Sequence, residues 1–364
     1  MRKGRFALAL LLAFMFTIPL CPALGETPET ADESRLVITL TGRIGLGDTT
    51  RWNTQTRSLT VVQADKADDW LLGDFKELFT ADDLTLGCLH MPFVNGEIRK
   101  PSDASLFNAP EEAVRFLTAA GVDAVCLADE NVGDYSTAGY ANTQRVLDEA
   151  GILHFGTMET RAGDTFDELL IWLVKDTRIG VVGYDNPTER DVPAILERVN
   201  LLREHGCGIV IVSVEWAKPD ANSPTSVSFN LAQQLVDGGA DVIWGHGSDA
   251  LHPIYFYKGK PVIMSLGALC DGYSGAVDTF GAVLHLEYDL TGETPELRVM
   301  RTTALKTGKR GEYNPFVLQI EKNRKVGFSK LIPQKSRGDM TAIPKDFADT
   351  GILWIEPDGS IRAK

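Results

Sequence analysis

Acidic, amide, thiol and imidazole side chains follow several apolar stretches of this sequence, at the point where each stretch ends. In chain order they are Asp48, Cys88, His90, Asp129, Glu130, Asn131, Asp134, Glu215, His246 and Asp249. If the apolar stretches are strands of a parallel core, their carboxyl ends bring these groups to one sheet edge. Packing alone does not require polar groups there, so we interpret them as a candidate site.

His246 is the first candidate, because the pair Gly245-His246 follows a buried strand and begins a polar loop. Other members of the set also have ordinary structural explanations. Gly47-Asp48 is typical of a turn, Cys88 of a small buried residue, and Glu215 beside Trp216 of a solvated strand end. The remaining histidines lie inside strand or helix patterns and are interpreted as structural: His154, His205, His252 and His285.

Strands and helices alternate along most of the chain. Apolar, β-branched runs predict strands at Arg35 to Thr41, Asp83 to Leu89, Val122 to Leu127, Gly208 to Glu215 and Asp241 to Trp244. Helical spacing predicts helices at Asp65 to Phe79, Glu111 to Ala120, Thr137 to Ala150, Pro193 to His205 and Phe229 to Val236, with a weak helix near Asn314 to Asn323. Leu169 to Val174 and Ile179 to Tyr184 read as a hairpin. The pattern predicts an α/β fold with a mixed sheet or two packed sheets.

The first 25 residues have the three-part pattern of a secretory signal peptide. Basic residues precede an apolar run from Phe6 to Leu20, and Ala23-Leu24-Gly25 supplies small residues for cleavage. An uncleaved N-terminal membrane anchor is the alternative. We therefore expect an exported protein with a linker at 26–34, one main domain at 35–310 and a C-terminal extension at 311–364.

The chain is acidic, which limits its partners. Without residues 1–25 it has 33 basic and 50 acidic residues. Such a surface repels phosphates, so it disfavours nucleic acid and anionic lipid and leaves a cation or an uncharged glycan open. The four cysteines beyond the signal are Cys88, Cys126, Cys207 and Cys270. They form no CxxC pair and are interpreted as small buried residues rather than disulfides.

Two long sequence frames carry a family resemblance. They are AAGVDAVCLADENVGDYSTAGYANTQRVLDEAGILHFG from Ala119 to Gly156 and GGADVIWGHGSDALHPIYFYKGKPVIMSLG from Gly238 to Gly267. Through them the chain resembles the CapA family of poly-γ-glutamate capsule synthesis proteins (PgsA-like). The resemblance implies a metallophosphoesterase-like, four-layer α/β/β/α sandwich with mixed sheets. It also implies a role in making or exporting poly-γ-glutamate or a related anionic or glycan polymer of the cell envelope, with a membrane polymer synthase as a partner.

The polar positions depart from the family pattern. We align Asp48 with the family's opening Gly-Asp and His246 with the first His of G-H-H-P-H, whose last His is replaced by Asp249. Gly87-Cys88-Leu89-His90 stands in place of G-N-L-E, and Asp129-Glu130-Asn131 in place of N-N-H, although Asp134-Tyr135 is kept. Glu215-Trp216-Ala217 replaces H-W-G. Carboxylates have therefore taken three of the family's imidazole or amide places.

Two interpretations of this altered set remain open. In the first, Asp48, Asp129, Glu130, Glu215, His246 and Asp249 hold Mn²⁺, Mg²⁺ or Ca²⁺, which suit carboxylates better than Zn²⁺ does, in a phosphoesterase or amide hydrolase. His246 is then a ligand or general acid, and Asp129 or Glu130 the base. In the second, catalysis is lost and the scaffold binds a polymer or a partner. No nucleotide-binding fingerprint is present.

Overall fold

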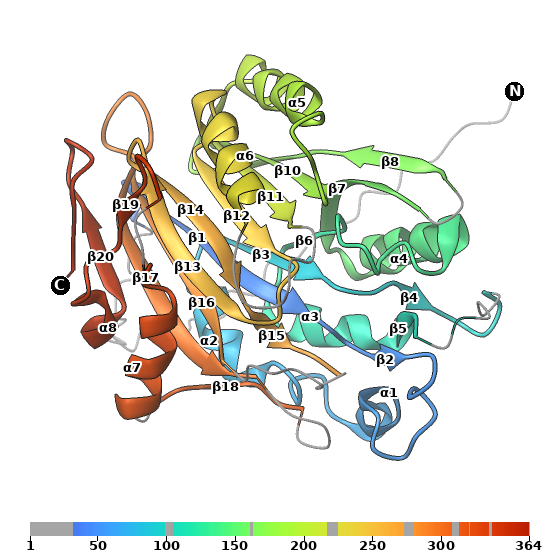
Figure 1. Cartoon of the computed structure of the whole chain (residues 1–364). Helices are drawn as coiled ribbons and strands as arrows, with labels where there is room; N and C mark the ends of the chain where they lie inside the picture. Colours follow the sequence, from blue (N-terminus) through green and yellow to red (C-terminus); the bar gives the residue numbers. More distant parts are fainter. Residues whose placement is uncertain are drawn as a thin grey trace, which may run out of the picture. The chain divides into compact units, whose positions relative to one another are not determined.

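The computed structural model describes residues 32–363, apart from 99–102, 104, 161–162, 217–224, 273–279, 308–312, 320 and 335–336. The predicted signal peptide and most of the predicted linker at 26–34 lie outside the described residues. Residues from Glu33 onwards form one compact unit (Figure 1). None of the helices in the described ranges is long and apolar enough to cross a membrane.

The first sheet is built around β1 (Arg35–Ile44). This strand pairs in parallel with β3 (Leu84–Leu89) and antiparallel with β16 (Phe280–Asp289). Beyond β3 the sheet continues in parallel through β6 (Ala124–Cys126) and β7 (Leu153–Glu159). Beyond β16 it continues antiparallel through β17 (Glu296–Lys306), β20 (Ile352–Ile355) and β21 (Ile361–Ala363). The sheet is therefore parallel on one side of β1 and antiparallel on the other.

The second sheet has four parallel strands at its centre. They are β10 (Thr177–Asp185), β11 (Cys207–Glu215), β12 (Val242–His246) and β14 (Lys260–Leu266). Its antiparallel edges are β9 (Leu170–Val174) on one side and β13 (Leu251–Tyr257) with β19 (Thr341–Ala342) on the other. The β9–β10 pair confirms the predicted hairpin. Strand β7 also pairs with β10, so the two sheets are joined at this point.

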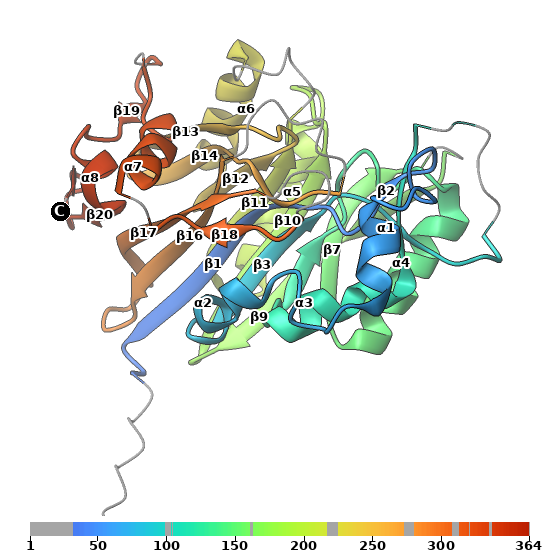
Figure 2. The same ribbon diagram turned by 90° about the horizontal axis from the view of Figure 1, so that it is seen from below.

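Apolar residues of both sheets meet in a shared core, which includes Ile38 and Leu86 from the first sheet and Ile211 and Trp244 from the second. The outer face of the second sheet packs against α5 (Val192–Glu204) and α6 (Ser226–Asp237). The outer face of the first packs against α2 (Lys76–Thr80), α3 (Val114–Ala120) and α4 (Ser136–Ala150). Figure 2 shows these layers from below. The predicted four-layer α/β/β/α arrangement with mixed sheets is confirmed.

Glycine ends two of these helices where the sequence predicts a stop. Gly121 and Gly151 have φ angles of +88° and +73°, and their backbone N–H groups cap α3 and α4. This left-handed conformation costs glycine little because it has no Cβ. The remaining short elements are β2 (Asp48–Thr49), α1 (Leu59–Val62), η1 (Gln63–Asp65), η2 (Gly73–Phe75), β4 (Phe93–Val94), β5 (Phe107–Pro110), η3 (Glu111–Ala113), β8 (Thr165–Glu168) and β15 (Ala268–Cys270).

Two predicted helices are wrong in extent. The segment from Asp65 to Phe79 forms turns, the short η2 and the start of α2 instead of one helix, since Gly73 interrupts the helical spacing. The weak helix near Asn314 begins later, as α7 (Glu321–Lys330). Pro315 and pairing with the end of β17 hold Phe316 and Val317 in a short strand, β18, so a tertiary contact overrides local propensity.

The C-terminal extension is integrated into the sandwich. Its strands β20 and β21 extend the first sheet and β19 extends the second. Phe328 of α7 and Phe347 of α8 (Phe347–Thr350) are buried in the shared core. The extension therefore closes one edge of the two-sheet core.

Candidate functional site

The ends of β10, β11 and β12 supply one half of the site. Asp185 is in register with Glu215, and Glu215 with His246, so three polar residues end three adjacent parallel strands. Ser213 lies two residues before Glu215 and therefore on the same face of β11. Parallel pairing alone thus brings these side chains to one edge of the second sheet.

The ends of β1, β3 and β6 supply the other half. Arg43 lies at the end of β1, His90 follows β3 directly, and Asp129 comes three residues after β6. Asp129 accepts a hydrogen bond from the backbone N–H of Asn131 at 3.0 Å. This local turn fixes the carboxylate at the junction of the two sheets.

Asp129, Glu215 and His246 form a buried triad with the geometry of a metal site. One potential ligand atom from each lies within 4.8 Å of the other two, and all three side chains are at most 3% exposed. The sequence prediction that these residues meet agrees with this geometry. The predicted ligands Asp48, Glu130 and Asp249 are not part of the triad.

His246 has one ring nitrogen bonded and the other unsatisfied. Its Nε2 lies 3.0 Å from Ser213 Oγ, whereas its buried Nδ1 has no hydrogen-bond partner. Burial lowers the pKa of His246 to about 4, despite the opposing effect of Asp129. The imidazole is therefore neutral at physiological pH. It can serve as a ligand through a free lone pair, but the alternative role of general acid is not supported.

Arg43 places a permanent positive charge beside the triad. The side chain is 4% exposed, and its Nη1 donates to Asp249 at 2.6 Å. Its Nε lies 3.6 Å from Asp129, and its Nη2 contacts the His90 ring. Burial lowers the pKa of Arg43, but Asp249 and Asp129 outweigh that effect and raise it. The guanidinium thus remains charged and links carboxylates of both halves.

Asp129 is the ionised carboxylate of the site. Burial raises its pKa, but His90 and Arg43 outweigh this effect and lower the pKa to about 2. The His90 Nδ1 lies 3.1 Å from either Asp129 oxygen, and Asn131 Nδ2 lies 3.3 Å from the same nitrogen. Asn131 and His90 therefore orient Asp129 rather than joining the triad.

The pKa values of Glu215 and Asp185 are raised, in contrast to that of Asp129. Burial, followed by the charges of Asp129 and Asp185, raises the pKa of Glu215 well above its usual value. Burial and the charges of Asp129 and Glu130 raise the pKa of Asp185 to about 6. Glu215 also accepts a hydrogen bond from the backbone N–H of Glu130 at 2.6 Å. In the metal-free protein Glu215 therefore holds a proton that a bound cation would displace.

Several predicted site residues have other surroundings. Asp48 accepts a hydrogen bond from the Thr60 backbone N–H at 3.1 Å and lines a separate cavity of about 160 Å³. Asp134 accepts one from the Phe107 backbone N–H at 2.9 Å. Glu130 contributes its backbone, and its side chain is exposed.

Cys88 lies at the floor of the site but is not suited to be a ligand. Burial, followed by Cys126 and Asp129, raises its pKa well above the usual value, so the thiol stays protonated. Cys88, Cys126, Cys207 and Cys270 are all free and buried. The prediction of small buried cysteines is confirmed.

Sequence reasoning missed Arg43, Asp185 and Ser213. Arg43 stands in the Gly42-Arg43 pair that ends the first predicted strand, where only carboxylates were sought. Asp185 directly follows the predicted hairpin strand that ends at Tyr184. Ser213 precedes Glu215 by two residues, which is the period that puts both on one face of a strand. Each of the three residues could have been found from its position relative to the end of a predicted strand.

Comparison with known proteins identifies the family. The family described as bacterial capsule synthesis protein PGA_cap matches residues 37–273, which include every residue of the site. The chain belongs to this family. The resemblance expected from the two sequence frames is therefore confirmed.

Curated relatives of the family carry related names. The chain is 23% identical over 279 residues to the capsule biosynthesis protein CapA of Bacillus anthracis, covering 71% of this chain and 61% of that protein. It is 22% identical over 302 residues to the PGA biosynthesis protein CapA of Bacillus subtilis strain 168, covering 78% and 75%. A probable polyglutamine synthesis accessory protein of Mycobacterium tuberculosis is 33% identical over 121 residues, which cover 32% of this chain and 31% of that relative.

Proposed function

We propose that this protein acts outside the cytoplasm on poly-γ-glutamate or a related anionic polymer during capsule synthesis, by cation-assisted hydrolysis at the Asp129–Glu215–His246 triad. The family and the names of its relatives support the polymer. The signal-peptide pattern of residues 1–25 supports export. The reaction class rests on the site itself.

The observation that carries the proposal is that His246, whose buried Nδ1 has no hydrogen-bond partner, groups with two buried carboxyl groups. A buried nitrogen without a partner is costly, and a cation at the triad would satisfy it. The charge balance agrees, since Arg43 offers one positive charge against Asp129, Asp185 and Asp249, and Glu215 would add a further negative charge on losing its proton. Two carboxylates and one imidazole suit Mn²⁺ well, with Mg²⁺ as the harder alternative.

The residues of the triad and their neighbours would then have separate roles. A bound divalent cation supplies Lewis acidity and lowers the pKa of a water molecule. Glu215 would lose its proton to become a ligand, and His90 with Asn131 keeps Asp129 oriented. Arg43 stays paired with Asp129 and Asp249 beside the triad and balances part of their charge. Neutral His246 acts only as a ligand.

Arg43 also supports a second function, which is a non-catalytic polymer-binding scaffold. Its guanidinium pairs with Asp129 and Asp249 without any metal, so part of the acidic cluster is already neutralised. In this case a cation is not needed, and the scaffold would bind the polymer without hydrolysing it. A membrane polymer synthase is a proposed partner in either case.

A metal and activity assay separates the two functions. The mature protein, purified without chelators, is analysed for bound metal and then incubated with poly-γ-glutamate of defined length in Mn²⁺, with product size followed by chromatography. If the protein is a hydrolase, the unsubstituted protein should hold one bound cation and shorten the polymer. Glu215→Gln should lose both the bound cation and the activity. Arg362→Gln, far along the chain in the C-terminal extension, is the control. Polymer of unchanged length together with metal-free protein would leave the scaffold function.

A further inference from the structure

A cavity of about 400 Å³ lies between β17 and α7, at the start of the C-terminal extension. It is larger than the cavity beside Asp48. Its walls are mixed: Ala304, Leu318 and Phe328 are apolar, whereas Thr302, Gln319 and Arg324 are polar. None of these residues belongs to the site around Asp129, Glu215 and His246, which is called the strand-end site below.

Thr302 lines this cavity and carries a hydroxyl group without a hydrogen-bond partner. The residue is 7% exposed, and its buried Oγ1 has no hydrogen-bond partner. Its backbone N–H is satisfied by the carbonyl oxygen of Gly351 at 2.8 Å. A buried hydroxyl without a partner costs free energy, which a polar ligand in the cavity would recover.

Arg324 contributes a guanidinium of which one nitrogen, Nη2, is hydrogen-bonded. Its Nη2 donates to the Glu321 carboxylate at 3.2 Å and to the main-chain oxygen of Asp349 at 3.4 Å. Its Nη1 and Nε donate to no group among the described residues. A guanidinium with two adjacent donors matches a carboxylate in bidentate geometry.

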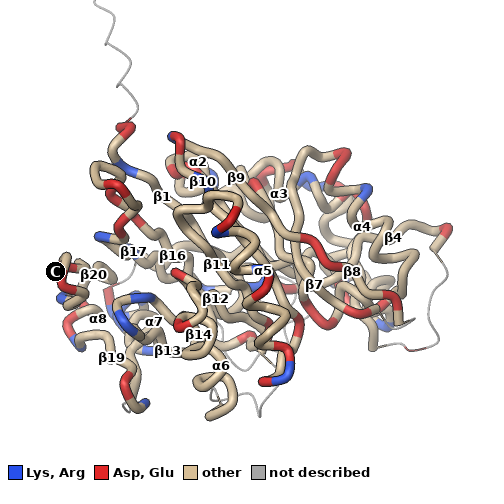
Figure 3. Tube along the Cα trace, turned by 90° about the horizontal axis from the view of Figure 1, so that it is seen from above, with Lys and Arg blue, Asp and Glu red and all other residues tan. Residues whose placement is uncertain are grey.

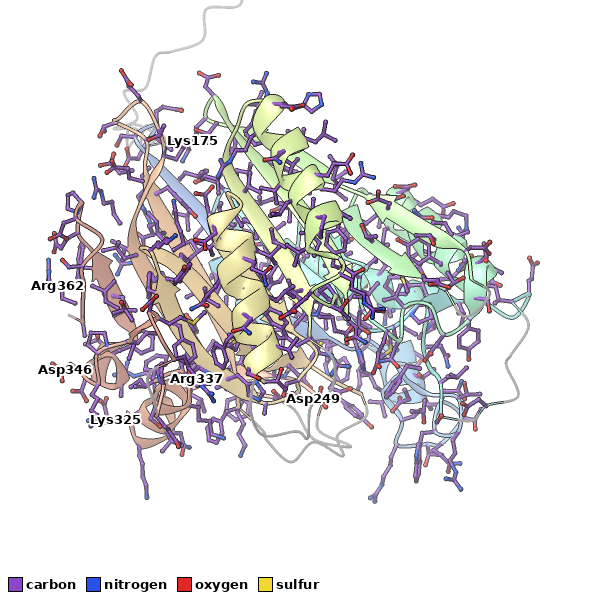
Figure 4. All side chains as sticks on the ribbon, turned by 45° about the horizontal axis from the view of Figure 1, so that its top comes forward. Lys175, Asp249, Lys325, Arg337, Asp346 and Arg362 are labelled. Atoms are coloured by element: carbon purple, nitrogen blue, oxygen red, sulfur yellow. The ribbon has the colours of Figure 1, made fainter. Side chains whose placement is uncertain are left out.

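The charge of the surrounding segment is opposite to that of the rest of the protein. Residues 306–364 contain twelve Lys and Arg against seven Asp and Glu, although the whole chain has a net charge of −14. Helix α7 alone has four basic residues and one acidic residue. In Figure 3 much of the α7 trace is coloured as Lys or Arg, and Figure 4 shows Lys325 projecting from the same helix. An anionic chain is attracted here and repelled elsewhere.

We propose that the β17–α7 cavity binds a repeat unit of the anionic polymer, separately from the strand-end site. A glutamyl unit offers a carboxylate to Arg324, an amide to Thr302 and Gln319, and methylene groups to Leu318 and Phe328. This inference rests on the proposed function for the identity of the polymer. The extension would then hold the chain while the strand-end site acts on it.

Binding of end-labelled poly-γ-glutamate, measured by fluorescence anisotropy, tests the inference. We expect Arg324→Gln to raise the Kd at least about tenfold, because it removes a charge-assisted hydrogen bond. Thr302→Val keeps the side-chain shape and is expected to raise the Kd about threefold without lowering the unfolding midpoint. Arg362→Gln removes the same charge from the same extension, where it pairs with Glu356, and is expected to change the Kd less than twofold.

The outcomes separate this inference from the proposed function. The difference in Kd between Arg324→Gln and Arg362→Gln should persist when each is combined with His246→Gln, even if these proteins bind no Mn²⁺, so a failed metal site leaves the cavity assignment intact. Equal Kd values for Arg324→Gln and Arg362→Gln would overturn the inference. Absence of polymer binding by the unsubstituted protein would also overturn it.

Discussion

Two buried histidines have almost the same immediate chemistry and different surroundings. His246 ends β12, and His285 lies within β16 of the other sheet. Each has one ring nitrogen near a hydroxyl group, Ser213 Oγ at 3.0 Å or Thr39 Oγ1 at 2.8 Å, and one buried nitrogen without a partner. Burial lowers the pKa of both to about 4. An unsatisfied imidazole is therefore not sufficient to mark a site.

The difference lies in the carboxylates. The buried Asp129 and Glu215 each have a potential ligand atom within 4.8 Å of one on His246, whereas no described metal-ligand group includes His285. The nearby Glu287 pairs with Arg35 and Arg301, and both arginines are more than 40% exposed. Strand ends allow groups from several strands to converge, while a mid-strand residue meets only its two neighbours. The following substitutions compare these two regions.

The largest expected effect is the loss of the central carboxylate. Asp129→Ala leaves Arg43 as a buried charge without its Asp129 partner, and we expect it to reduce the free energy of unfolding by about 3–5 kcal/mol. Glu287→Ala removes a pair that solvent screens, and about 1 kcal/mol is expected. Urea denaturation in the presence of a chelator measures both. Equal losses would mean that the strand-end region is no more tightly coupled than the mid-strand region.

The pH dependence of stability isolates His285. Its folded-state pKa of about 4 lies below the ordinary value of 6.5, so the unfolded chain binds the proton more readily between these values. Stability from neutral His285 is complete above about pH 6.5 and is lost as the pH falls to 4, by about 3 kcal/mol. His285→Gln lacks this contribution, so its stability should approach that of the unsubstituted protein on acidification. A constant difference between pH 7.5 and 4 would contradict the prediction.

The fold was largely predictable because its signals are local. Apolar strands, helical spacing and the glycines that end α3 and α4 each act within about fifteen residues, and the two long frames indicated the architecture. The failures came where distant contacts decide, as at Phe316, which the edge of β17 holds in a strand.

The site was predictable in part for the same reason. Asp129, Glu215 and His246 follow strands that the sequence reveals, and a parallel core places their ends together. Arg43 was missed because its role depends on Asp249, 206 residues later in the chain. Asp48 was aligned with the family's Gly-Asp pair, yet it lies past the end of β1, on a separate short strand against Asn108. Register, which sequence does not specify, decides which polar residue faces the centre.

Metal affinity compares the two histidines directly. We expect His246→Gln to weaken Mn²⁺ binding at least about tenfold, since the triad loses its only nitrogen ligand. His285→Gln should bind Mn²⁺ like the unsubstituted protein, because its ring lies outside the triad. Calorimetric titration of the chelator-treated proteins gives both affinities. Equal weakening by the two substitutions would show an effect of folding rather than of ligation.

The smallest effects come from the two hydroxyl partners. Thr39→Val and Ser213→Ala each remove the hydroxyl that contacts a buried imidazole, and each is expected to cost about 1 kcal/mol of unfolding free energy. Only Ser213→Ala should also weaken Mn²⁺ binding, by several-fold, because Ser213 sets which nitrogen of His246 faces the carboxylates. Unchanged Mn²⁺ affinity in Ser213→Ala would mean that burial in the strand end, rather than the hydroxyl, fixes the ring. The convergence of carboxylates would then be the whole difference between the two histidines.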